Sequence, residues 1–222
     1  MPKLEVLGRT LRISYGNGVG TAFTMEVNNV QYLVTARHIF MDDYPSTAQI
    51  GIYDNKRYVA CKVDIRYPKN KDIDIAVMRT NPYVQLTPAY PVTFASTNIA
   101  IGQDAYFLGF PYDYDRYLYN LPNSKRPMPL VKKVCVSGYI PSVGQLLLDG
   151  HNNPGFSGGP VCFQQADGSN YCIAGVIASY RYEPLAVCDP RGRETDMFVK
   201  ANTGIVNAYD IKYAVDIAEA WG

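Results

Sequence analysis

The stretch NPGFSGGP, residues 153–160, places one serine, Ser157, among three glycines and two prolines. This composition predicts a tight turn, because glycine adopts backbone conformations closed to other residues and proline presets its own φ. A serine hydroxyl is a weak nucleophile until a base takes its proton, so a reactive Ser157 requires a histidine. The chain has two histidines, His38 and His151, and both precede the serine.

One alternative interpretation of the serine motif is excluded by this order. Residues 155–159, GFSGG, also fit the G-x-S-x-G pattern in which the serine joins a strand to a helix and the histidine follows it in the chain. No histidine follows Ser157, and Pro160 with the β-rich VCF after it disfavours an immediate helix. The turn therefore calls for a base upstream of the serine.

The rest of the chain is typical of an all-β protein. Two β-rich runs, 21–27 and 30–35, flank Asn28 and Asn29, a pair suited to a tight hairpin. Alternation of apolar and polar residues over 59–65 predicts a strand with one buried face that includes Cys61. Further strands are expected at 73–78, 105–108, 131–139, 145–148, 160–164 and 171–179, with a turn at 167–168. Short strands with polar turns indicate sandwiches or barrels.

Only the end of the chain is expected to be helical. Asp210 can cap a segment whose apolar residues from Ile211 to Trp221 recur at helical spacing and form one stripe. Residues 81–91 contain three prolines and no clear period, and they are the expected link between two halves. Residues 111–129 form a long tyrosine- and proline-rich loop, for which a functional role and a solvated excursion both stay open.

Three stretches, in order, resemble the chymotrypsin-like (trypsin-like) serine proteases. They are LVTARHIF at 33–40, DIAV at 74–77 and NPGFSGGP, and the last is closest to the HtrA-type bacterial branch. The resemblance extends more weakly from Gly20 to the C-terminal helix and covers a protease domain only. It implies two antiparallel β-barrels with a C-terminal helix, divided here as residues 1–92 and 93–222.

The resemblance also implies the catalytic roles. His38 would be the general base and Asp74 the carboxylate that orients it, both on the first barrel, and Ser157 would be the nucleophile on the second. Asp74 is preferred over Asp72 and Asp64 because it directly precedes an apolar run and can lie half buried. The backbone amides of Gly155 and Ser157 would form the oxyanion hole.

The sequence departs from the digestive branch of the family at two kinds of position. Phe156 stands where that branch has an aspartate, so no ion pair with a newly released amino terminus is expected. The five cysteines lack CxxC spacing and are expected to be reduced. The alternatives are a bridge from Cys135 to Cys162, which the family resemblance suggests, or a pair of Cys162 and Cys172 across a hairpin.

Substrate recognition is also assigned by resemblance. Residues 177–180, IASY, would form one pocket wall, with Ser179 supporting Asp74. The backbone of Ser179, Tyr180 and Arg181 would pair with the substrate as an added strand. Residues 202–204, which include Thr203 and Gly204, would form the opposite wall, His151 would lie near the pocket floor and Arg181 at its rim. A polar or acidic preference is expected from His151 and Arg181; the alternative is that both face solvent.

Composition excludes several function classes. The 222 residues are 47% hydrophobic and 18% charged, and 21 basic residues nearly balance 20 acidic ones, so no nucleic-acid or membrane partner is expected. No signal peptide or membrane span is recognised, which favours the cytoplasm; a secreted mature form stays open. Asp113 and Asp115 are expected to be solvated rather than metal ligands, and Arg37 to be a surface charge pointing away from the cleft.

These observations predict a serine endopeptidase that acts on polypeptides and needs no cofactor or metal. A regulatory protein partner is compatible with the sequence. The alternative is a catalytically inactive or partner-activated binding module on the same fold.

Overall fold

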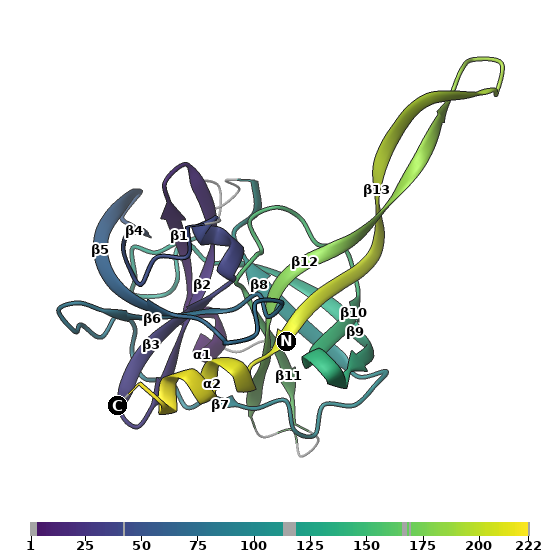
Figure 1. Ribbon diagram of the computed structural model, residues 1–222. Helices are drawn as coiled ribbons and strands as arrows, with labels where there is room; N and C mark the ends of the chain where they lie inside the picture. The colour runs from purple at the N-terminus through teal and green to yellow at the C-terminus, as the bar shows by residue number, and fades with distance from the viewer. Residues whose placement is uncertain (1–3, 42, 113–118, 166–167, 169, 222) are drawn as a thin grey trace.

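The computed structural model describes residues 4–41, 43–112, 119–165, 168 and 170–221, and its strands form two antiparallel barrels (Figure 1). After the short helix α1 (Leu4–Leu7), six strands close the first barrel in the order β1-β2-β3-β6-β5-β4. Their bounds are β1 Thr10–Tyr15, β2 Gly18–Val27, β3 Val30–Thr35, β4 Thr47–Asp54, β5 Arg57–Arg66 and β6 Ala76–Thr80.

The second barrel is built from the strands after residue 92. Six strands form a ring, β11-β8-β9-β10-β13-β12, because β11 also pairs with β12, while β7 adds to β12 in parallel. Their bounds are β7 Thr93–Phe94, β8 Asp104–Gly109, β9 Leu130–Ile140, β10 Gln145–Asp149, β11 Pro160–Gln164, β12 Tyr171–Cys188 and β13 Glu194–Asp210. The double barrel expected from the sequence is confirmed.

The hairpin between β2 and β3 forms at the predicted place. Asn28 and Asn29 adopt φ of 50° and 62°, and Val27 pairs with Val30 across them. Positive φ at both central residues is the geometry that matches the right-handed twist of the flanking strands. Asparagine tolerates this region better than most residues, which is why the pair marked the turn.

The two predicted strands that follow need correction. In β5 only Val63 and Ile65 are buried; Cys61 is half-buried and Val59 is exposed, so the predicted buried face covers only the end of the strand. The strand predicted at 73–78 begins at Ala76 instead. Ile73 and Ile75 are buried as part of the core without belonging to the sheet, and their apolar character alone suggested a strand.

The C-terminal helix α2 (Lys212–Glu219) ties the second barrel to the first. Asp210 Oδ1 accepts a hydrogen bond of 2.8 Å from the Lys212 amide, so Asp210 satisfies a free amide at the start of the helix. Ala214, Ala218 and Trp221 are buried in a cluster that includes residues of β2 and β3, and the Trp221 ring lies 5.4 Å from that of Tyr32. The predicted apolar stripe is thus the docking face.

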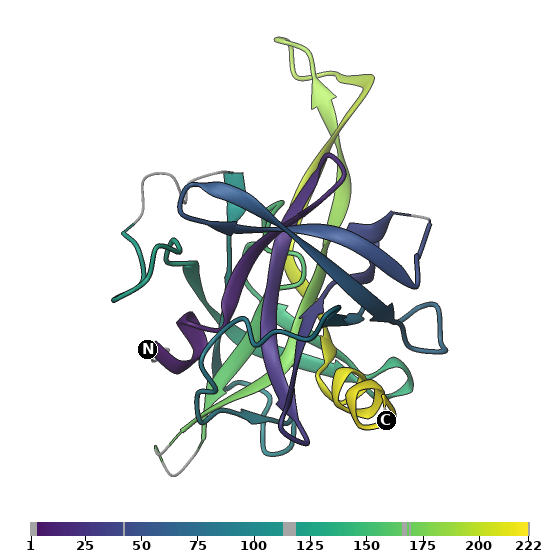
Figure 2. The ribbon, with the colours of Figure 1, turned by 90° about the vertical axis from the view of Figure 1, so that its left-hand side faces the viewer.

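Four of the described strands, β1, β4, β7 and β13, were not predicted. The strand expected at 171–179 continues as β12 to Cys188, and β13 was missed. Together they form a long twisted hairpin that rises out of the second barrel (Figures 1 and 2). Its outer part, residues 181–203, is called the arm below. Nearly all of its side chains are exposed or half-buried, so no alternating pattern marks these strands in the sequence.

None of the five cysteines, all of which lie in the described residues, forms a disulfide bond. Cys162 and Cys172 do not face each other across the β11–β12 hairpin: Cys162 pairs with Ile173, and the two thiols belong to different hydrophobic clusters. Neighbouring residues of a strand point to opposite faces, so a shift of one residue separates the two sulfur atoms.

Thiol reactivity follows from this burial. Only Cys188, on the arm, is exposed, whereas Cys162 and Cys172 are buried, and burial raises the pKa of the Cys162 thiol. Brief treatment of the native protein with iodoacetamide is expected to modify Cys188 about tenfold or more faster than these two, because the thiolate is the reactive form. Peptide mapping by mass spectrometry measures this. Equal modification of Cys162 and Cys188 would contradict the buried position of Cys162.

Candidate active site

The first half of the site is a histidine held by a carboxylate. His38 lies in a short 3-10 helix, Arg37–Phe40, directly after β3, and Asp74 lies just before β6. The His38 Nδ1 atom is 2.6 Å from Asp74 Oδ2, and the His38 backbone amide donates to Asp74 Oδ1 at 2.9 Å. Both carboxylate oxygens therefore hold the same residue. This contact fixes the ring so that Nε2 is left for chemistry, with 49% of the side chain exposed.

The competing carboxylates lie elsewhere. Asp64 accepts hydrogen bonds of 3.1 and 3.2 Å from the Asn81 side chain. Asp72 is exposed, and its backbone amide bonds the Asn70 side chain. The structure thus brings Asp74 to His38 and places neither Asp64 nor Asp72 there.

The prediction for Arg37 was wrong. Its side chain is buried, with the guanidinium 4.1 Å from the ring centre of Tyr44 and 5.2 Å from that of Tyr67. Strand alternation does not apply to Arg37, because the chain leaves β3 at Thr35 and turns into the 3-10 helix. Arg37 is therefore a packed support beneath the segment that carries His38.

The second half of the site is a tight turn that precedes the serine. The Phe156 amide donates to the Asn153 carbonyl at 3.3 Å, and Gly155 has a φ of 102°. Proline at the second position and a glycine of positive φ at the third are the signature of a type II turn. A Cβ at residue 155 would lie 2.5 Å from the Phe110 carbonyl oxygen, so only glycine fits.

Two backbone amides of this turn are available to a ligand. Neighbouring amides are used internally: Gly158 donates to Ile177 O at 2.7 Å and Gly159 to Phe156 O at 2.8 Å. The amides of Gly155 and Ser157 donate to no atom within the part of the chain that the structure describes. Free amides beside a nucleophile can stabilise an oxyanion.

Thr21, which sequence reasoning did not select, joins the two barrels at the serine. Its amide donates to Ser157 O at 2.9 Å, and its hydroxyl donates to Gly155 O at 2.7 Å. At Gly158 the barrels meet so closely that a Cβ would lie 2.1 Å from Thr21 O. These contacts link residues more than 130 positions apart, so no local pattern could have marked them.

Phe156 anchors the turn to the core of the second barrel. It is fully buried and packs edge-on against Phe107, with ring centroids 4.9 Å apart. An aromatic ring thus occupies the place after Gly155 where the digestive branch has its aspartate. The position is held by packing within the second barrel.

Lys132, on β9, is a second support that sequence reasoning missed. Its Nζ donates to the His151 carbonyl and, at 2.7 Å, to Asn153 Oδ1, and it lies 5.4 Å from the centre of the Phe156 ring. Partial burial lowers the pKa of Lys132. The ammonium group therefore connects the start of the turn to its aromatic anchor.

The Ser157 hydroxyl has one partner in this structure. It donates to the Ala178 carbonyl oxygen at 3.3 Å, and the described residues include no hydrogen bond between Ser157 and His38. In proteins without bound substrate, catalytic hydrogen bonds are often long and tighten only on binding.

The residues predicted to bind substrate lie on β12 and β13, except His151, which follows β10. The Ser179 hydroxyl pairs with the Asn207 side-chain amide at 3.2 Å, and Asp74 is held by His38 instead. Thr203 donates its hydroxyl to the Arg181 carbonyl at 2.9 Å, which joins the two predicted pocket walls. Of the remaining three residues, Tyr180 is half-buried, His151 is exposed and Gly204 has a φ of 78°.

The described residues contain no group of three or more potential metal ligands. Asp113 and Asp115 lie outside the described residues, as does Asp167 of the predicted turn. Among the helices described, none is long and apolar enough to cross a membrane.

Two antiparallel barrels, a histidine–aspartate pair on the first and a serine turn on the second define the architecture of chymotrypsin-like proteases. Residues 20–169 match the trypsin-like peptidase domain family. The chain belongs to this family. No curated protein sequence matches it significantly.

Solved structures share the fold at low sequence identity. The active form of the Rv3671c protease from M. tuberculosis is 14% identical, with a TM-score of 0.59 over 95% of this chain and 79% of that one. The serine endoprotease from Yersinia pestis is 16% identical, with a TM-score of 0.59 over 97% of this chain and 63% of that one. Deg5 is 19% identical, with a TM-score of 0.58 over 96% and 88%. This chain thus spans less than two thirds of the Yersinia endoprotease.

Proposed function

We propose that the protein is a serine endopeptidase in which His38, Asp74 and Ser157 act together. The observation that carries the proposal is that both carboxylate oxygens of Asp74 contact His38. The barrel that holds this pair contacts the Ser157 turn through Thr21. A carboxylate held against Nδ1 keeps the imidazole in the tautomer that accepts a proton at Nε2.

The reaction follows from these positions. Ser157 Oγ adds to the peptide carbonyl carbon while His38 Nε2 takes the hydroxyl proton, and the Gly155 and Ser157 amides stabilise the resulting oxyanion. His38 then gives the proton to the leaving amine, and the C–N bond breaks to leave an acyl-enzyme. Water, deprotonated by His38, hydrolyses the ester and restores Ser157.

One observation favours a second candidate function. The Ser157 hydroxyl is directed to the Ala178 carbonyl rather than to His38, as expected for a protease that a partner switches on or for an inactive binding module. The two candidates differ in what rotates the serine towards His38: substrate alone, or a regulatory protein.

A fluorophosphonate probe separates these candidates. We expect covalent labelling at Ser157 without any added protein, no labelling of a Ser157→Ala variant and strongly reduced labelling of His38→Ala. Intact-protein mass spectrometry and peptide mapping identify the modified residue. Labelling only when a partner is added would establish a switched protease, and no labelling under any condition would establish the binding module.

Lys132 is expected to position the turn at residues 153–156, which leads to the proposed oxyanion-hole amides of Gly155 and Ser157. Lys132→Met keeps the aliphatic stem but removes the bonds to His151 and Asn153, and hydrogen bonds to charged groups contribute about 1.5–3 kcal/mol each. We expect kcat on a peptide substrate to fall about 10- to 100-fold with KM nearly unchanged. Lys132→Arg is expected to restore part of the rate.

The matched control for Lys132 is its neighbour. Lys133→Met removes an exposed ion pair with Asp104 and leaves the turn untouched, so kcat is expected to stay within about twofold. Melting temperatures of both variants report on stability separately. If Lys132→Met lowered the melting temperature but left kcat unchanged, Lys132 would be structural only.

A further inference from the structure

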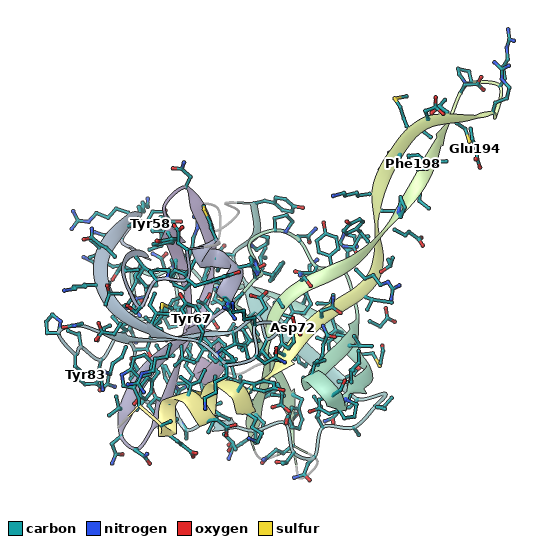
Figure 3. All side chains as sticks on the ribbon, in the orientation of Figure 1. Tyr58, Tyr67, Asp72, Tyr83, Glu194 and Phe198 are labelled. Carbon is teal, nitrogen blue, oxygen red and sulfur yellow. The ribbon has the colours of Figure 1, made fainter. Side chains whose placement is uncertain are left out.

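The arm carries several large apolar side chains that are exposed to solvent. Five large apolar residues on it are between 50% and 66% exposed: Tyr182, Leu185, Met197, Phe198 and Val199. Figure 3 labels Phe198 on the arm, away from both barrels. A two-stranded ribbon alone is only marginally stable in water, and exposed apolar patches mark binding surfaces. The arm therefore has the character of an interaction surface.

Both faces of the arm are apolar. Leu185 pairs with Val199, and Ala186 pairs with Phe198. Paired residues share a face and successive residues alternate, so the two pairs point to opposite faces. A partner that meets this arm can contact apolar side chains on either side.

Charge favours an apolar partner and disfavours a lipid surface. Residues 181–203 carry four basic and four acidic residues, so the arm attracts neither polyanions nor polycations. The tip is polar, since Asp189 and Arg193 form an ion pair there. A hairpin that entered a membrane end-on would place these charges in hydrocarbon first.

The arm continues the edge at which the candidate nucleophile lies. Ala178, whose carbonyl accepts the Ser157 hydroxyl, belongs to β12, and the same strand runs on into the arm. On the side opposite β13, no described strand pairs with β12 beyond Ile177. The arm's base is braced by the Thr203–Arg181 hydrogen bond. A polypeptide that pairs with residues 179–181 and continues along β12 therefore contacts the arm.

Pro184 determines how such a chain can bind beyond this point. Pro184 pairs with Lys200 on β13, and a proline in a paired strand turns its nitrogen, which has no hydrogen, to the open edge. Backbone pairing along the open edge is interrupted there, as in edge strands that resist self-association. Recognition beyond Pro184 must use side chains, and edge-to-edge pairing with a second copy is disfavoured.

We propose that the arm is a docking surface for an extended apolar segment of the substrate polypeptide, outside the residues that enter the cleft. This inference rests on the proposed function and deepens it: the substrate class is unfolded or extended protein with an apolar stretch near the cleaved bond. Continuity of β12 from the Ser157 contact to Leu185 and beyond is the argument for this occupant over any other.

The test measures binding separately from catalysis. In a Ser157→Ala background, the binding of fluorescein-labelled, reduced and carboxymethylated lactalbumin is followed by anisotropy. We expect Kd to rise at least about tenfold when Leu185, Met197, Phe198 and Val199 are all replaced by threonine, which keeps β propensity but removes apolar surface. A matched control replaces Val84 and Ile101, exposed apolar residues off the arm, and is expected to leave Kd unchanged.

With Ser157 restored, the fourfold variant is expected to hydrolyse a short peptide ester at the parent rate but to cleave the unfolded protein at least about tenfold more slowly. Equal Kd values for the fourfold variant and the control would overturn the proposal. It would also be overturned if the parent formed a concentration-dependent dimer that the fourfold variant lost, since the arm would then bind a second copy. If binding depends on the arm but no fluorophosphonate labelling occurs, docking stands and the proposed protease activity fails.

Discussion

Replacement of Ser157 by alanine is expected to lower turnover of a good peptide substrate roughly a million-fold, because in the proposed mechanism the nucleophile and the His38–Asp74 pair act as a unit. The loss is chemical rather than structural: the one hydrogen bond that the hydroxyl makes, to Ala178 at 3.3 Å, contributes about 1 kcal/mol or less. Single-turnover and steady-state rates on a peptide amide, with the melting temperature, measure both effects.

Ser137→Ala is the control, since Ser137 is exposed on β9. This variant should keep the parent rate. If Ser157→Ala kept more than about one hundredth of the parent activity, the nucleophile would have to be another residue, because background catalysis without a nucleophile is far weaker.

Asp74→Asn is expected to lower kcat about ten-thousand-fold. The amide can occupy the same space, but it lacks the charge that stabilises the protonated imidazole and can present an N–H to Nδ1, which favours the wrong tautomer. Both oxygens of Asp74 contact His38, so no neighbouring carboxylate can substitute without moving the chain. Kinetics on the peptide amide across pH measure the change.

Asp72→Asn is the matched control, two residues away on an exposed segment. Its kcat is expected to stay within about twofold of the parent, since an exposed carboxylate contributes little. If the two variants changed places in this ranking, Asp72 would be the orienting carboxylate.

Lys132 and Phe156 stabilise the turn at residues 153–156. In the digestive branch an ion pair formed after cleavage has this role. In this chain a buried ring packs against Phe107 and an ammonium group bonds the chain at His151 and Asn153. Both supports exist in the folded chain.

Local features of the chain were predictable because their causes are local. Asn28 and Asn29 marked a hairpin through their tolerance of positive φ, and Asp210 with its apolar stripe marked the helix. The order of His38, Asp74 and Ser157 ruled out the elbow interpretation without a structure. Alternation failed where the chain leaves the sheet, as at Arg37, and where neither face is buried, as in the arm.

The sequence by itself determined the all-β class, the motif order and the glycines that the turn before and after Ser157 demands, because backbone conformation and side-chain alternation are written in neighbouring residues. The double barrel was implied by the resemblance of the three motifs to a known family. Only the tertiary structure decided that Thr21 meets the serine turn, that Lys132 meets Asn153 and that the free edge of β12 leads into the arm, and it separated Asp74 from Asp64 and Asp72 as the partner of His38. These contacts join residues 21 to 134 positions apart. Sequence spacing carries no signal for them, since they form only when each barrel closes or, for Thr21, when the two barrels pack together.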